Sequence, residues 1–294
     1  MVLFLLLLPP MLWASASLID RMLVDGDGKD ARPGALMAIF GLFNLIAALL
    51  VGIWIALSGA TLSVSCVALA ANGITHTIAM WLYLHALRNE ETSRVVPWFQ
   101  IVPIFGVLGG TIVLGELPTL TQTAAILLLM IGGFAISIKN GIAKRKMMGL
   151  MLVACALLAV NDVVFAHFGR EIKGAPALFS DIAGKAFWGL LFLTGKHSRE
   201  GFVIGLKTKL GLQSTSEALS IGADFFFDIG KLMIPVAIVQ ATACATPLFT
   251  LFGAVLLTAY LPKLLREELG GALWKKLAGI LLVITGGVIL AVSL

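Results

Sequence analysis

The chain uses one stretch of sequence twice, and this internal repeat constrains its fold more than any other feature. The first copy runs over residues 86–133 and the second over residues 230–287. In each copy 17 positions separate the first residue from a proline, Pro103 or Pro247, and a phenylalanine stands two positions after that proline. Both copies end on a Gly-Gly pair. The prolines are 144 residues apart and the Gly pairs 154, which places about ten extra residues in the second copy.

A weaker echo lies upstream of the repeat. The stretch Trp13–Asp20 precedes the similar stretch Leu158–Phe165 by 145 positions, in the same phase as the repeated prolines. A period near half of the 294 residues indicates a duplication. We therefore predict two domains of one kind, residues 1–140 and residues 141–294.

The composition indicates whether this chain lies in water or in a membrane. Hydrophobic residues make up 59% of it and charged residues 13%, against about 25% charged residues in an average soluble domain. We therefore expect the chain to lie in a lipid bilayer. Its net charge is +5, but its basic residues are scattered between the apolar runs, which does not favour nucleic-acid binding. The cysteines Cys66, Cys155 and Cys244 lie inside apolar runs without C-x-x-C spacing, so we expect small buried side chains, no metal and no cofactor.

The apolar runs predict an all-α membrane protein. A span needs about 20 apolar residues, and ten stretches qualify: residues 1–19, 35–57, 62–87, 95–115, 119–138, 147–168, 175–195, 213–232, 235–258 and 275–293. Five spans per half is an odd number, so the two halves must cross the membrane in opposite directions. We therefore expect ten transmembrane helices in two inverted five-helix repeats, with Pro103 and Pro247 related by a pseudo-two-fold axis in the membrane plane.

Local features refine this picture. Residues 1–19 could be misread as a signal peptide cleaved after Ala16, but they lack a basic start and share the upstream echo, which favours a retained span. Pro9 and Pro10 remove two backbone donors and predict an interruption of the first helix. Residues 202–212 predict a short helix at the membrane interface.

The loop charges predict an orientation. Odd-numbered loops hold 17 lysines and arginines, whereas even-numbered loops hold three, Arg170, Lys173 and Lys231. Positive loops stay in the cytoplasm, so the count places the odd loops inside a cell (inner) membrane and both termini outside.

These features resemble the EamA-type domain of the drug/metabolite transporter superfamily. The resemblance implies ten helices, inverted halves, a central cavity and transport of small metabolites; it implies the opposite orientation, with cytoplasmic termini. The second copy is looser, with Ala259-Tyr260 in place of the family's Gly-Glu and Asp224 and Asp228 at its Asn-like positions. The motif residues in the first copy are Ala86-Leu87-Arg88, Pro103, Gly115-Glu116-Leu117-Pro118 and Gly132-Gly133.

Ionisable residues inside spans are functional candidates, because a charge at the bilayer centre costs at least about 2.5–3.5 kcal/mol. Asp181 and Lys185 are spaced i, i+4 and predict an ion pair, with a role toward substrate for Lys185 as the alternative. Asp224 and Asp228 share the same spacing and repel unless Lys185 or Lys231 compensates them.

Asp162 has no base four residues away in its own helix, so it needs a partner elsewhere, a proton or a ligand. A buried carboxyl without a partner takes up a proton rather than stay charged. We therefore predict proton coupling through Asp162, Asp224 and Asp228. The predicted cavity lining is Trp13, Ser17, Asn44, Asn72, His76, Tyr83, Trp98, Gln100, Asn161, Asp162, Asp181, Lys185, Asp224 and Gln240.

The function predicted is secondary transport of a small polar or amphipathic metabolite, cationic or zwitterionic, by a monomer or homodimer that alternates access between its halves. A passive facilitator or channel is the alternative, and a structural scaffold is the third. No enzyme is expected, because G-x-x-x-x-G-K-[ST], H-E-x-x-H and G-x-S-x-G motifs are absent. An intramembrane aspartyl protease would need Asp162 and Asp224 as its pair, and Gly222-Ala223-Asp224 resembles its motif only loosely.

Overall fold

The computed structural model describes residues 2–24, 32–89, 95–137, 145–250, 252–253 and 273–293, and these residues form helices and short connections without a strand. Four helical segments are long and apolar enough to cross a membrane: Pro33–Ser58, Ser65–Asn89, Met147–Ile172 and Ala175–Thr194. Shorter apolar helices lie at Leu6–Asp20, Trp98–Leu114, Leu120–Ala135, Val236–Thr250 and Leu277–Leu290. The chain is therefore an all-helical, multi-pass membrane protein.

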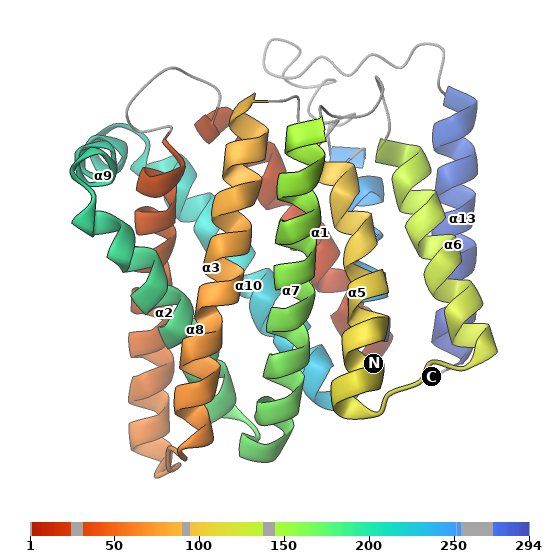
Figure 1. Ribbon diagram of the computed structural model, residues 1–294, viewed down its shortest axis with the longest axis horizontal. Helices are drawn as coiled ribbons and strands as arrows, with labels where there is room; N and C mark the ends of the chain where they lie inside the picture. Colours follow the sequence, from red (N-terminus) through yellow and green to blue (C-terminus); the bar gives the residue numbers. More distant parts are fainter. Residues whose placement is uncertain are drawn as a thin grey trace.

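The helices pack in pairs whose axes run between the upper and lower edges of Figure 1. The elements are α1 (Val2–Val24), α2 (Pro33–Ser58), α3 (Ser65–Asn89), the 3₁₀ turn η2 (Val96–Ile101), α5 (Val102–Gly109), the π turn η3 (Gly110–Leu114), α6 (Leu120–Ser137), α7 (Arg145–Ile172), α8 (Ala175–Leu190), the 3₁₀ turn η4 (Leu191–Thr194), α9 (Lys196–Thr208), α10 (Leu210–Met233), α11 (Val236–Ala243) and α13 (Leu273–Val292). The start of α1 and the end of α13 both lie at the lower edge (Figure 1).

The main contacts between helices occur in matching pairs. A contact between a helix of the first half of the sequence and one of the second half has a counterpart between the two helices at the corresponding places in the other halves. Helix α1 packs on α10, and α7, the first helix of the second half, packs on α3. Likewise α5 contacts α7 while α11 contacts α1, and α3 contacts α8 while α10 contacts α2. Three pairs map onto themselves: α2 with α8, α5 with α11, and α6 with α13.

Glycines let several of these helices approach closely, as small residues do in membrane interfaces. A Cβ on Gly73 of α3 would lie 2.5 Å from the carbonyl carbon of Gly184 on α8. At the α6–α13 contact the closing glycines of the two repeat copies act reciprocally. A Cβ on Gly132 would lie 2.7 Å from the Gly279 oxygen, and one on Gly286 would lie 2.9 Å from the Ala125 oxygen.

Three local predictions have definite outcomes. The predicted break at Pro9 and Pro10 is wrong, because α1 continues as one helix through both prolines; a helix in a bilayer tolerates them where neighbouring groups meet the freed carbonyls. The stretch 202–212, predicted as one short interfacial helix, is divided in the structure, because α9 begins at Lys196 and ends at Thr208 and α10 begins at Leu210. Residue 251 and residues 254–258 of the ninth predicted span (235–258) lie outside the described residues.

Candidate functional site

A cavity of about 240 Å³ is lined by residues from both halves of the sequence. Its wall comes from α1, α2, α3, α7, α8, α10 and α11 and from the η2–α5 junction. Apolar side chains, including Phe40, Phe99 and Phe227, cover much of this wall. A concave site of this kind, mostly apolar with a few polar groups, is the usual form of a small-molecule site.

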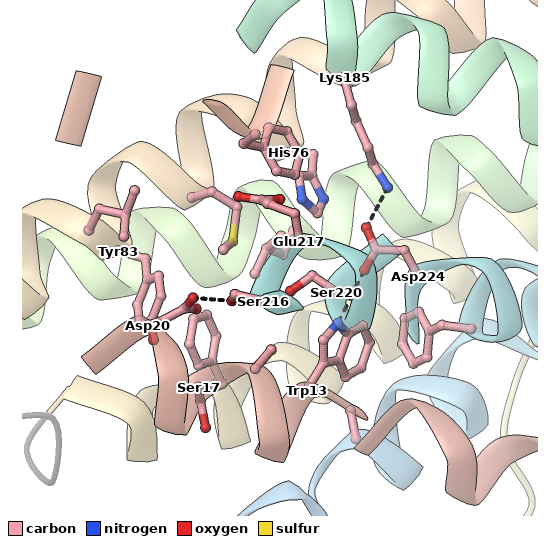
Figure 2. Close-up of a pocket in the computed structure, with 18 of the residues that line it drawn as sticks. Trp13, Ser17, Asp20, His76, Tyr83, Lys185, Ser216, Glu217, Ser220 and Asp224 are labelled. Atoms are coloured by element: carbon pink, nitrogen blue, oxygen red, sulfur yellow. Dashed lines mark hydrogen bonds and ion pairs between the residues drawn. The ribbon is translucent and has the colours of Figure 1, made fainter. Parts of the chain in front are cut away.

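Helix α10 presents a continuous polar stripe to the cavity. The lining residues recur every three or four positions along it: Gln213, Ser216, Glu217, Ser220, Asp224, Phe227, Asp228 and Lys231. This is the period of one helix face. Helix α1 lines the cavity opposite this face with Trp13, Ser17 and Asp20. Helices α1 and α10 are antiparallel, because Trp13 contacts Asp224 and Asp20 contacts Ser216 (Figure 2).

One cluster of charges is centred on Lys185 of α8. Its ammonium lies 2.8 Å from Asp181, the pairing that the i, i+4 spacing predicts, and 2.9 Å from Asp224 on α10. The indole N–H of Trp13 donates to the other oxygen of Asp224 at 3.2 Å. This cluster ties α1, α8 and α10 together (Figure 2).

A second cluster is centred on Lys231 of α10. Its ammonium lies 2.8 Å from Asp162 on α7 and 2.5 Å from Asp228. The amide of Gln240 on α11 donates to Asp162 at 2.9 Å. The Lys231 ammonium also lies 4.6 Å from the ring centre of Phe165, within the range of a cation–π contact. We call the Lys185 and Lys231 clusters together the ion-pair layer.

Beyond the ion-pair end of the cavity, contacts of Arg170 and Glu116 join the end of α7 to the α10–α11 connection. Arg170, at the end of α7, lies 2.5 Å from Glu116 and donates to the carbonyls of Lys231 at 3.0 Å and Ile234 at 2.8 Å. Glu116 also accepts the backbone N–H of Val236 at 2.9 Å, which caps the start of α11. The Gly-Glu of the first repeat thus holds the α10–α11 connection in place.

The opposite end of the cavity is acidic. Asp20 accepts a hydrogen bond from Ser216, and Glu217 lies next to it on α10 (Figure 2). The Oε2 atom of Glu217 is buried without a hydrogen-bond partner among the described protein atoms. The sequence analysis did not select Asp20, Ser216 or Glu217. The regular spacing of polar residues in α10 was the feature that could have identified the last two.

The cavity collects most of the predicted lining. Trp13, Ser17, His76, Tyr83, Gln100, Asn161, Asp162, Lys185, Asp224 and Gln240 all contribute to its wall, as does the predicted coupling residue Asp228. His76 stacks on Phe40 with ring centres 5.7 Å apart. Gln100 and Gln240, which precede the two repeat prolines, both reach the same cavity.

Four predicted residues, Asn44, Asn72, Trp98 and Asp181, are not among the residues that line the cavity. The side-chain amide of Asn72 donates to the backbone carbonyl of Asn161 at 3.0 Å. The side-chain amide of Asn161 donates in return to the backbone carbonyl of Asn72 at 3.3 Å, so the two residues join α3 to α7. Asn44 donates to the Phe40 carbonyl of its own helix, and the Trp98 carbonyl accepts the Cys155 thiol. Asp181 is fully buried behind Lys185. Within the described ranges, no three metal-ligating side chains gather into a metal site.

The comparisons with known proteins agree with this architecture. Residues 1–138 match the model of the EamA-like transporter family, which confirms the resemblance seen in the sequence. A crystal structure titled only as that of a protein is similar over 98% of this chain and 95% of its own, with 16% identity and a TM-score of 0.64. No curated protein matched the sequence. The first part of the chain is therefore similar to EamA-like transporters, and the apolar helices agree with a multi-pass membrane protein.

Proposed function

We propose that this EamA-like chain is a secondary transporter that carries a small polar or amphipathic metabolite across the inner membrane of the cell. The observation that carries the proposal is the cavity of about 240 Å³, which residues from both halves of the sequence line with ionisable side chains. Ionisable residues in membrane-spanning helices mark substrate or ion pathways. The proposed substrate site lies there, between the halves.

Alternating access follows from the packing. Contacts that keep their pattern on exchange of the halves support two inverted five-helix repeats, residues 1–140 and 141–294, related by an axis in the membrane plane. Rocking of one half against the other would open the cavity to one side of the membrane and close it to the other, and we propose the Arg170–Glu116 contact as the gate at one end. The charge count of the loops keeps the odd-numbered loops in the cytoplasm as our prediction for orientation.

We further propose that protons drive the transport. Four buried or nearly buried carboxylates, Asp162, Asp181, Asp224 and Asp228, share only two ammonium groups in the ion-pair layer. The layer therefore has a formal excess of two negative charges, which protons or a cationic substrate would neutralise. Opening the cavity to water would release such a proton.

Flux into proteoliposomes tests this mechanism. Thermal stabilisation of the purified protein across a metabolite library first identifies a transported compound. Its uptake is then measured with and without a pH gradient. We expect uptake to follow the gradient, and we expect Asp162→Asn and Asp224→Asn each to flatten the pH dependence while the protein stays folded.

Passive facilitation is the second candidate, and one observation favours it. Asp162, Asp224 and Asp228 each contact a lysine at 2.9 Å or less, as structural ion pairs do. Substrate uptake that ignores the pH gradient, with both asparagine variants unchanged, would establish the facilitator. Asp162 and Asp224, the pair that an aspartyl protease would need, contact different lysines.

A further inference from the structure

The cavity has two stations along the α1–α10 pair. Trp13 marks the first by its bond to Asp224, and Asp20 marks the second by its bond to Ser216. Seven residues of α1 separate the two marks, which is about 10 Å along a helix. The first station belongs to the ion-pair layer, and the second is the acidic end, which we define as Asp20, Gln213, Ser216 and Glu217.

Polar atoms at the acidic end lack partners. Glu217 has a buried Oε2 without a partner, and Gln213, which is 1% exposed and lines the cavity, has none for either amide atom among the described protein atoms. A buried polar group without a hydrogen bond is costly. Carboxylate and amide oxygens accept hydrogen bonds, so most of the unmet capacity here calls for a donor.

Among the described residues, neither Asp20 nor Glu217 forms an ion pair with a lysine or arginine. In Figure 2 Lys185 lies on the side of Asp224, and its ammonium is bound to Asp181 and Asp224. The titratable groups that α3 brings to this part of the wall are His76 and Tyr83. Two carboxyls from two helices therefore face one cavity without a cation between them.

The neighbouring wall fits an organic body. Tyr83 and Phe99 line the cavity with ring centres 5.0 Å apart, and Phe40 and Met80 lie on the same wall. Aromatic faces attract cations in addition to apolar groups. A ligand with a cationic head and a compact apolar or aromatic body would match the charge of this end and the surface beside it.

We propose that Asp20, Glu217 and Gln213 form a subsite for the primary ammonium group of an amphipathic amine. The proposal rests on the proposed transport function for its biological role and names the substrate class of that same cavity. A primary ammonium has three N–H donors, enough for both carboxyls and the Gln213 carbonyl oxygen. A quaternary ammonium has the charge but no donor, so the subsite should prefer the primary head.

Binding of four probes with one ring tests the subsite without any transport measurement. Benzylammonium, benzyltrimethylammonium, benzyl alcohol and benzoate are titrated into the purified full chain in detergent by calorimetry. We expect benzylammonium to bind at least about tenfold more tightly than each of the others, because hydrogen bonds to charged groups are the stronger kind. Asp20→Asn and Glu217→Gln should each weaken benzylammonium binding by about tenfold or more.

Two further variants separate the subsite from general effects. Glu171→Gln, which changes an exposed carboxylate at the far end of α7, should leave binding unchanged. Gln213→Leu keeps both carboxyls and should reduce the preference for benzylammonium over benzyltrimethylammonium. Benzylammonium binding that survives Asp20→Asn and Glu217→Gln but is lost in Asp224→Asn would place the cation at the ion-pair layer and overturn the subsite, while the transport proposal would stand. Tighter binding of benzoate than of benzylammonium would also overturn it.

Discussion

The two ends of the cavity differ in how their charges are matched. In the ion-pair layer each carboxylate contacts an ammonium, and Lys231 is 2% exposed between Asp162 and Asp228. At the acidic end Asp20 has a serine as its partner, and Glu217 has an oxygen with none among the described atoms. One helix, α10, supplies residues to both ends.

This difference separates structural charge from binding charge. Ion pairs join α7 and α8 to α10, and the hydrogen bond from Gln240 adds α11. Removing one partner of such a pair leaves a buried charge behind. Among the described residues Asp20 and Glu217 form no ion pair between helices, so removing either charge leaves no buried cation without a partner. The contrast predicts large losses of stability on one side of the cavity and small ones on the other.

The largest effect is expected at Lys231. Its replacement by methionine, Lys231→Met, keeps the length of the side chain but leaves Asp162 and Asp228 without their shared cation. Removing one partner of a buried pair costs about 3–5 kcal/mol. Unfolding of the purified protein, followed by helical circular dichroism during SDS titration, should show a loss of this size. Lys207→Met on the exposed face of α9 is the matched control and should change little.

A smaller effect is expected at Glu116, beyond the ion-pair end of the cavity. Glu116→Ala removes both the contact with Arg170 and the acceptor for the Val236 N–H. The loss of a cap and a charged hydrogen bond at a partly exposed site should cost about 1–3 kcal/mol. Glu116→Gln keeps an acceptor and should cost less than Glu116→Ala in the same SDS titration. Equal losses for the two variants would show that the charge, and not the cap, carries the effect.

Spacing within one helix made part of the site predictable. The Asp181–Lys185 pair follows from a separation of four residues, because such side chains lie on one helix face. The need of Asp162 for a distant partner was also predictable, but the identity of that partner, Lys231, was not. Contacts between helices depend on rotation and depth, which a single sequence does not encode in any local pattern.

The residues missed in the sequence had a weaker local pattern. Glu217 and Gln213 were not among the predicted site residues, although both lie in the predicted span 213–232. The polar residues of α10 recur with helical period from Gln213 to Lys231, and this regularity marks one face rather than one residue. The role of Glu116 in capping α11 could not be predicted, since it joins residues 120 positions apart.

A third effect tests whether the ion-pair layer has excess negative charge. Asp228→Asn leaves Lys231 with one carboxylate, Asp162, and an amide of the same shape. The remaining pair is neutral, so the unfolding free energy should change by less than about 1 kcal/mol. The loss of unfolding free energy in Asp228→Asn is compared with the loss in Lys231→Met, measured in the same detergent. A loss as large as that of Lys231→Met would mean that all three charges act as one unit.

The smallest effect is expected at the acidic end, where Glu217→Gln replaces a carboxyl with a neutral amide of nearly the same volume. No ion pair is lost among the described residues, and repulsion from Asp20 is removed, so stability should stay within about 0.5 kcal/mol of the parent. Asp162→Asn is the matched change in the ion-pair layer and should cost more, since Lys231 and Gln240 both bind that carboxylate. SDS titration of both variants in one detergent makes the comparison. If Glu217→Gln lost as much as Asp162→Asn, the carboxyl at residue 217 would belong to the packing of α10, and the two ends of the cavity would not differ as the contacts indicate.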